Sequence, residues 1–292
     1  MQPEANKLTD SIAYGAIDGL PEPYLRSIGR VFARFGAPTQ DSGNVSYGVE
    51  ANGARYFVKT AGAPDDPKPF VDFEGRVAAL RAAVRFASTF SHPTLPTLHG
   101  AIESRHGPML VYDWRDGELL RVPAEQRNDP RSSFQRFRAL PPDDILRCLD
   151  AIYDLHALIA RAGWVGVDFY DGALIYDFGS KRLTVMDLDL YRPEPFRNDM
   201  GRMFGSSRFM APEEFELGAP IDQRTNMFTM GRMGLVFLSD GTMNRSAFRG
   251  GNPTFAVVAR ACADVREARF ESMAAFHDAW RAARARDAGT VV

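Results

Sequence analysis

The sequence predicts an α+β fold in which a small antiparallel sheet with one helix precedes a mainly helical part. Two strand-like runs, at 45–50 and 54–59, are joined by Asn52-Gly53, the dipeptide that most strongly indicates a β-hairpin. From residue 72 onward, apolar residues recur at spacings of three and four, which predicts an amphipathic helix. Further along, an apolar stripe predicts a helix over 143–163, and a run that is apolar nearly all round predicts a buried helix over 225–238.

Composition narrows the class of protein. The chain has 292 residues, of which 45% are hydrophobic and 25% charged, enough for one large domain or two lobes with a substantial core. The net charge is −2 and there is no long basic stripe, so nucleic acid is not expected as a partner. No signal peptide and no 18-residue apolar run is present, so we expect a cytoplasmic protein with no membrane segment. The two cysteines, Cys148 and Cys262, are expected to be buried thiols.

The most informative stretch runs from 164 to 213. Apolar runs at 173–176 and 183–186 flank a polar turn and predict a second hairpin. A hairpin brings its outer ends together, and here both ends border acidic residues, which would hold a divalent cation such as Mg²⁺ with phosphate oxygens. The alternative is that they are solvated loop aspartates. The four acidic residues are Asp168, Asp171, Asp187 and Asp189.

The segment that follows carries a family resemblance. GSSRFMAPEEF, at 205–215, resembles the end of the activation segment of protein kinases, where a Gly-Thr-x-x-Tyr-x-Ala-Pro-Glu pattern occurs. Ser206 stands in the Thr place and Phe209 in the Tyr place, and the Ala-Pro-Glu triplet at 211–213 matches outright. The chain is therefore similar to the protein-kinase-like superfamily over residues 40–280, in a divergent bacterial Ser/Thr kinase-like branch.

This resemblance implies a bilobal protein-kinase-like fold and roles for particular residues. Asp168 stands where the His-Arg-Asp motif ends and would orient or deprotonate the acceptor hydroxyl. Asp187 stands where the Asp-Phe-Gly motif begins and would bind Mg²⁺, while Lys59 would neutralise phosphates of ATP. We expect both Asp187 and Lys59 to face solvent. In the family a helix glutamate pairs with the strand lysine, and Glu74 is the candidate here. Arg269 resembles the arginine that pairs with the Ala-Pro-Glu glutamate, Glu213.

Two further segments are assigned to nucleotide binding. Small residues just before the first hairpin would let backbone N–H groups approach phosphates, although Val45 occupies the place of the middle glycine. This loop is at least as similar to that of aminoglycoside phosphotransferases. Residues 112–117 resemble the hinge between lobes, with backbone groups free to bond an adenine edge. The expected binding residues are Ser42, Gly43, Asn44, Val45, Lys59, Glu74, Tyr112 and Asp113.

The expected organisation is a loosely ordered leader over 1–20, an N-lobe over 21–111, the hinge over 112–117 and a C-lobe over 118–292. Residues 24–35 suit either a short helix or the approach to a strand. Residues 121–142 are polar and proline-containing, and their pattern indicates no function.

The sequence also departs from the kinase pattern. Gly166-Val167 replaces the His-Arg pair, and Ala173 stands where the family has a metal-binding Asn. The Asp-Phe-Gly motif is Asp187-Leu188-Asp189, which resembles that of small-molecule kinases. A second Mg²⁺ would then need Asp171 or Asp189 as its ligand, unless the site holds one metal.

The function expected from the resemblance is an ATP- and Mg²⁺-dependent phosphotransferase acting on Ser/Thr of a protein. Two alternatives stay open: a pseudokinase, which binds nucleotide without turnover, and a small-molecule kinase with a small hydroxyl-bearing acceptor.

Overall fold

The computed structural model describes residues 8, 15–36, 42–65 and 71–289, and it has the predicted α+β class. The chain forms two compact units, Met1–Arg115 and Asp116–Val292, which we describe separately. The division between them falls inside 112–117, the range predicted as a hinge.

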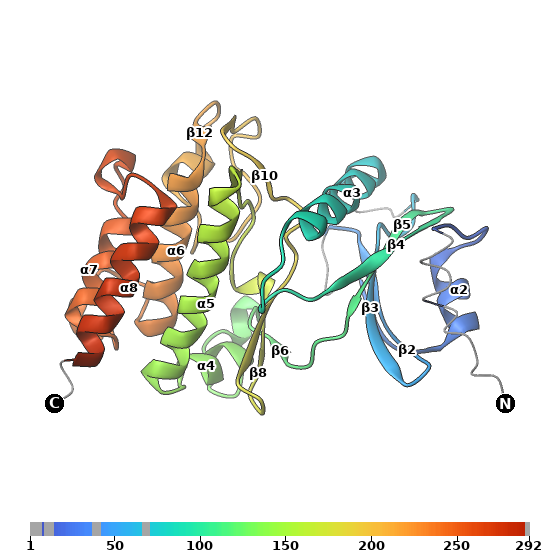
Figure 1. Ribbon diagram of the computed structural model, residues 1–292, viewed down its shortest axis with the longest axis horizontal. Coiled ribbons are helices and arrows are strands. Elements are labelled where there is room, and N and C mark those ends of the chain that lie inside the picture. Colours follow the sequence, from blue (N-terminus) through green and yellow to red (C-terminus); the bar gives the residue numbers. More distant parts are fainter. Residues whose placement is uncertain (1–7, 9–14, 37–41, 66–70, 290–292) are drawn as a thin grey trace. The chain divides into compact units, whose positions relative to one another are not determined.

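Unit 1 contains a five-stranded antiparallel sheet in the order β1-β2-β3-β5-β4 (Figure 1). Its described elements are α2 (Pro21–Ile28), β1 (Arg30–Phe35), β2 (Val45–Ala51), β3 (Ala54–Thr60), α3 (Phe73–Thr89), β4 (Leu98–Ser104) and β5 (Gly107–Asp113). Residues 24–35, which suited either a helix or the approach to a strand, contain the end of α2 followed by β1.

The first predicted hairpin is confirmed. β2 and β3 pair from Val45 opposite Thr60 to Ala51 opposite Ala54. The turn residues Asn52 and Gly53 have φ angles of 51° and 77°. Two successive positive φ values are what a tight hairpin turn compatible with strand twist requires, which explains the Asn-Gly pair.

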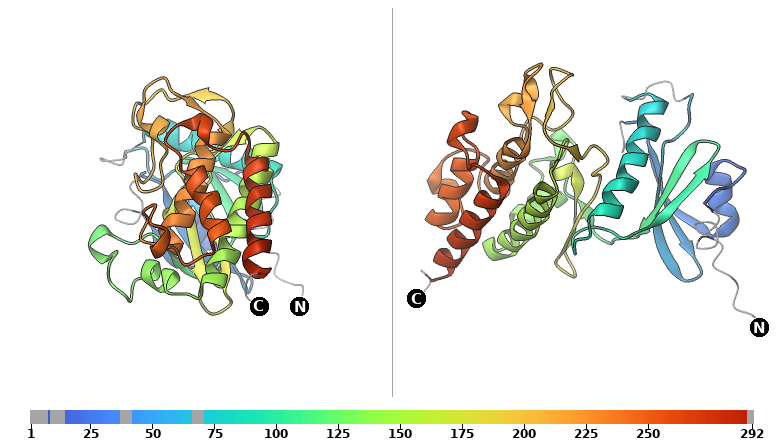
Figure 2. Two further views of the ribbon diagram at one scale, coloured as in Figure 1. Left: turned by 90° about the vertical axis from the view of Figure 1, so that its left-hand side faces the viewer. Right: turned by 45° about the horizontal axis from the view of Figure 1, so that its top comes forward.

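The sheet of unit 1 carries a core on each face, because successive residues of a strand point to opposite sides. On β5, Leu110 belongs to a cluster with Leu80 and Ala83 of α3. Its neighbours Met109 and Val111 belong to a second cluster, which includes Leu8 and the α2 residue Leu25. Helices α3 and α2 therefore cover opposite faces, as Figures 1 and 2 show.

The expectation of a loose leader over 1–20 is wrong for the part that the structure describes. Leu8 is fully buried, and Ile17 packs against the same cluster. The Ile17 N–H donates to the Glu103 carbonyl at 2.8 Å, and the Glu103 N–H donates to Gly15 at 2.9 Å. Apolar burial therefore places Leu8 in the core, and backbone pairing with β4 fixes residues 15–17 on the sheet.

Unit 2 is mainly helical, with α5, α6, α7 and α8 packed side by side (Figure 2). Its α-helices are α4 (Ser133–Arg138), α5 (Pro142–Arg161), α6 (Gln223–Leu238), α7 (Asn252–Ala261) and α8 (Met273–Gly289). Short 3₁₀ turns lie at η1 (Ala124–Gln126), η2 (Asp171–Ala173), η3 (Pro212–Phe215), η4 (Arg245–Ala247) and η5 (Arg266–Ala268).

The second predicted hairpin is also confirmed and lies within a three-stranded sheet of order β6-β8-β9. Its outer ends meet as expected, because the Met186 N–H donates to the Ala173 carbonyl at 2.9 Å. The strands of unit 2 are β6 (Glu118–Leu119), β7 (Trp164–Val165), β8 (Leu174–Asp177), β9 (Arg182–Val185), β10 (Arg192–Pro193), β11 (Phe196–Arg197) and β12 (Pro220–Ile221). β7 pairs with β10, and β11 with β12.

Cys148 and Cys262 are buried free thiols, as predicted. Burial raises the pKa of each thiol to about 12, so both stay protonated at neutral pH. Within the described residues, no helix has the length and apolar character needed to cross a membrane.

Candidate functional site

Lys59 lies near the end of the central strand β3 of unit 1. It is opposite Ser46 on β2 and Leu110 on β5. Directly opposite residues share a face of the sheet, so Lys59 points to the face that α3 covers. Its exposed fraction is only 7%, so the expectation of a solvent-facing lysine is wrong. The neighbouring strands β2 and β5 flank this position on both sides.

Helix α3 buries an arginine where a glutamate was expected. Asp72 caps the helix by accepting from the Gly75 N–H at 2.7 Å. Glu74 is exposed, whereas Arg76 has an exposed fraction of 1%. Residues two apart on a helix are separated by about 200°, so the two side chains cannot both face the sheet. Arg76 lies on the apolar stripe three residues after Phe73, which is the signal that could have identified it.

The guanidinium of Arg76 joins two loops next to the predicted phosphate-binding segment. Its Nη1 donates to the Gly43 carbonyl, and its Nη2 donates to the Ala63 carbonyl at 3.0 Å. Gly43 has a φ of +88°, a conformation that favours glycine. The Asn44 N–H donates to Ser42 Oγ over a long 3.4 Å. The backbone of this loop is therefore held from the side of α3.

Two N–H groups of the expected adenine-binding backbone are engaged within unit 1. The Asp113 N–H donates to Thr97 at 3.0 Å and the Trp114 N–H to Arg55 at 3.1 Å. Tyr112 is half-buried opposite Phe57. Burial alone would raise the pKa of Asp113, but the 2.6 Å contact with His99 Nε2 helps to hold that pKa below its usual value. These two N–H groups are thus not free, contrary to the expectation from the sequence.

In unit 2, the loop that carries Asp168 is held by α6. Asn226 accepts from the Gly166 N–H at 2.7 Å and donates to the Gly166 carbonyl at 2.7 Å. A Cβ on Gly166 would lie 2.5 Å from Tyr191 Cζ, so only glycine fits. Asp168 itself is half-buried with a φ of 63°, a left-handed conformation that Asp and Asn adopt more readily than other side-chain residues.

The surroundings of Asp168 come from the segment that resembles an activation segment. A Cβ on Gly205 would lie 3.7 Å from Asp168 Oδ1, which places the carboxylate beside that glycine.

Behind the loop, His156 Nε2 lies 2.8 Å from the Tyr191 hydroxyl, and His156 Nδ1 lies 2.8 Å from the Ile152 carbonyl. Burial and then the Asp168 charge raise the pKa of Tyr191 well above its usual value. His156 is therefore a buried residue whose two ring nitrogens both have partners within the protein.

The side chain of Asp171 pairs with an arginine of the segment at 205–215. It has an exposed fraction of 1% and forms an ion pair with Arg208 Nη2. Its other oxygen, Oδ1, is buried and accepts no hydrogen bond from the described residues. Burial raises the pKa of Asp171 above its usual value, and the Arg208 charge opposes that rise. The sequence pattern did not indicate this pair.

The remaining two acidic residues differ in exposure. Asp187 follows β9, is exposed as expected and has a φ of 61°, whereas Asp189 is buried with an exposed fraction of 9%. Within the described part of the chain, no group of three or more His, Cys, Asp or Glu side chains is close enough to hold a metal ion. The hairpin thus brings the backbone of both acidic segments together without gathering three carboxylates.

The predicted Glu213–Arg269 pair is confirmed and is part of a larger network. Arg269 donates to both carboxylate oxygens of Glu213, at 2.7 and 3.0 Å. Arg266 and the Thr225 hydroxyl also donate to Glu213 Oε1, at 2.8 and 3.0 Å. The exposed fractions are 4% for Glu213 and 1% for Arg269. The network therefore joins η3 to α6 and to the turn before α8.

The neighbouring Glu214 is also buried, but its carboxyl group is hydrogen-bonded by a backbone N–H group and not by an arginine. It accepts from the Ala211 N–H at 2.7 Å, and its exposed fraction is 5%. Burial raises its pKa from 4.5 to about 8, and the charges of Glu213 and Asp168 add to that rise. Glu214 is therefore protonated at neutral pH, next to an ionised Glu213.

This raised pKa predicts a pH-dependent loss of stability. Between pH 4.5 and about 8 the folded chain keeps a proton that the unfolded chain releases, so raising the pH favours unfolding. Relative to wild type, Glu214→Gln should gain stability from pH 5 to 8, by at most about 1.4 kcal/mol per pH unit, and then level off. Thermal melts at several pH values measure this. Exposed Glu216→Gln is the control, and a pH-independent difference for Glu214→Gln would contradict the prediction.

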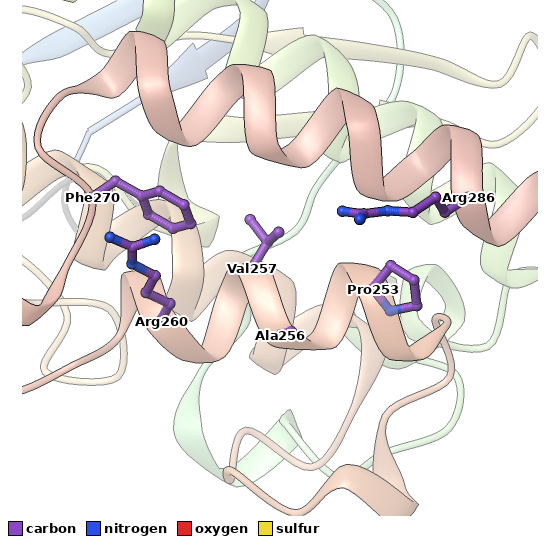
Figure 3. A pocket seen from close by; sticks show the side chains of 6 residues that line it. All are labelled: Pro253, Ala256, Val257, Arg260, Phe270 and Arg286. Carbon is purple, nitrogen blue, oxygen red and sulfur yellow. The ribbon is translucent and has the colours of Figure 1, made fainter.

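A cavity of about 360 Å³ lies elsewhere in unit 2, between α7 and α8 (Figure 3). Its lining is apolar in the middle with an arginine at each end, and it contains none of the predicted site residues. The lining residues are Pro253, Ala256, Val257, Arg260, Phe270 and Arg286.

Comparison with known proteins adds no assignment to this geometry. No protein-family model matches the sequence, and no curated protein is significantly similar to it.

Proposed function

We propose that this chain is an ATP- and Mg²⁺-dependent phosphotransferase with a bilobal protein-kinase-like fold, acting on Ser/Thr hydroxyls of a protein. The observation that carries the proposal is the buried Glu213–Arg269 pair. In the family that the sequence resembles, this pair anchors the activation segment, which is the docking platform for a protein acceptor. The Asn226 bonds to Gly166 support the same assignment, because they hold the Asp168 loop against α6.

The roles proposed for the individual residues are those that the resemblance to protein kinases implies. Asp168 orients the acceptor hydroxyl and accepts its proton. Lys59, with the loop at 42–45, holds the nucleotide phosphates. Asp187, the exposed carboxylate after β9, and Asp189 are the residues that would hold Mg²⁺, which neutralises charge on the phosphates during transfer.

The test is incubation with γ-labelled ATP and Mg²⁺, alone and with host lysate. Label on protein supports the proposal, and label on a small molecule would favour a small-molecule acceptor. Lys59→Met and Asp187→Ala should each abolish transfer. Both variants should fold, because methionine fits the mostly buried position of Lys59 and Asp187 is exposed. Transfer at the wild-type rate in either variant would exclude its assigned role.

A pseudokinase is the second candidate, and specific observations favour it. Ala173, in the place of the metal-binding Asn, is buried and offers no ligating side chain. Asp171, which could replace that ligand, is paired with Arg208. Nucleotide binding without transfer of label would support this candidate over the phosphotransferase.

The ion pair between Asp171 and Arg208 leads to a prediction for substitution of Asp171. Asp171→Asn should lower the stability by roughly 1–3 kcal/mol, because it leaves a largely buried guanidinium without its carboxylate. The Mg²⁺ concentration for half-maximal transfer should stay unchanged. Asp189→Asn is the matched variant and should raise that concentration. An increased Mg²⁺ requirement of Asp171→Asn with an unchanged melting temperature would instead make Asp171 a metal ligand.

A further inference from the structure

The buried side chain of Arg76 connects helix α3 to the loop at 42–45. Arg76 lies in the first turns of α3, yet its Nη1 donates to Gly43, which is 33 residues earlier in the chain. Its Nη2 donates to Ala63, just after β3. The planar guanidinium presents its N–H groups in a fixed fork, so one side chain holds both carbonyls at once. Burying such a charge is costly unless its N–H groups are used, and Arg76 uses both terminal nitrogens to hold these carbonyls.

The bond to Gly43 determines the direction of the next N–H group. A trans peptide is planar, so the Gly43 carbonyl and the Asn44 N–H point in opposite directions. With the carbonyl held by Arg76, the Asn44 N–H points away from that guanidinium. Its acceptor, Ser42 Oγ, is 3.4 Å away, so this donor is weakly used. A phosphate oxygen is a stronger acceptor and could take its place.

Two more observations concern the same loop. A Cβ on Gly62 would lie 2.3 Å from the Gly43 oxygen, so the loop packs against this glycine with no room for a side chain. Asn44 has an exposed fraction of 8%, and its Oδ1 accepts no hydrogen bond from the described residues. Turning this amide by 180° would present its NH₂ group, which can donate to a phosphate oxygen.

We propose that Arg76 is a positioning residue for a polyphosphate-binding loop. Through this residue, α3 sets the affinity for the phosphates of a nucleotide by holding the Gly43 carbonyl. The inference rests on the proposed function, because it takes the loop at 42–45 as the phosphate-binding segment. It differs from the kinase pattern in which the helix acts on the strand lysine through a glutamate, since Glu74 is exposed here.

The experiment compares the affinities of the full chain for MgATP, MgADP and adenosine, measured by calorimetry. Arg76→Met should weaken MgATP binding about tenfold, corresponding to one lost charged contact, and leave adenosine binding within about twofold. Arg76→Lys, which keeps the charge without the fork, should show the same selectivity with a smaller loss. Arg81→Met is the matched control, because Arg81 lies on the same helix but is exposed and pairs with Glu103 at 3.7 Å.

Gly62→Ala perturbs the same carbonyl by steric contact while keeping the Arg76 guanidinium, and it decides the question if Arg76→Met fails to fold. It should also weaken MgATP binding more than adenosine binding. Unchanged MgATP affinity in the folded variants, or an equal loss for adenosine, would overturn the inference and leave the proposed function standing. If the wild-type chain binds no nucleotide at all, the proposed function itself fails.

Discussion

Asp168→Asn is expected to lower the rate of phosphoryl transfer by about 10²-fold or more while nucleotide binding is retained. The reason is that asparagine cannot take the proton from the acceptor hydroxyl. The fold should be unaffected, because asparagine also adopts the left-handed conformation that Asp168 has, with a φ of 63°. The Asn226 bonds that hold the loop involve the Gly166 backbone and do not depend on the Asp168 side chain.

The measurement is initial-rate transfer of label from γ-labelled ATP, with nucleotide affinity determined on the same preparation. Asp199→Asn, at an exposed aspartate further along the chain, is the matched control. If Asp168→Asn transfers at the wild-type rate, the base is another residue. A loss of nucleotide binding instead of transfer would place Asp168 in nucleotide contact.

Glu213→Ala is expected to be the most destabilising of these substitutions. It removes the carboxylate to which Arg269, Arg266 and Thr225 all donate, and it leaves the buried Arg269 without a counter-charge. Removing one partner of a buried pair typically costs about 3–5 kcal/mol. For a unit of this size, that corresponds to a fall in melting temperature on the order of 10 °C.

Limited proteolysis gives a second measure of the same substitution. Because Glu213 anchors the end of the segment at 190–212, trypsin should cut the variant faster at the exposed Arg197 and Arg202. Exposed Glu216→Ala is the control and should behave like wild type. A Glu213→Ala protein that melts and digests like wild type would show that the network contributes little to stability.

The sequence was sufficient where a feature depends on local chemistry or on a motif with a fixed structural role. Asn52-Gly53 predicted the first hairpin because few residue pairs tolerate two positive φ values. The apolar runs at 173–176 and 183–186 predicted the second. The Glu213–Arg269 pair followed from the Ala-Pro-Glu resemblance, and the amphipathic helix from residue 72 onward followed from its apolar spacing.

Only the tertiary structure decided which charged side chains are buried and what they contact. Arg76 and Glu74 both fit the first turns of α3, and packing on the sheet buried Arg76. By its sequence position Asp171 was a candidate metal ligand, but in the fold it is paired with Arg208, 37 residues later. The periodicity of apolar residues in a helix or strand predicts which face of that element is buried. It does not predict the ion-pair partner of a buried carboxylate, because that partner can come from any part of the chain. Such partners are set by contacts between distant segments, which form only when the chain folds.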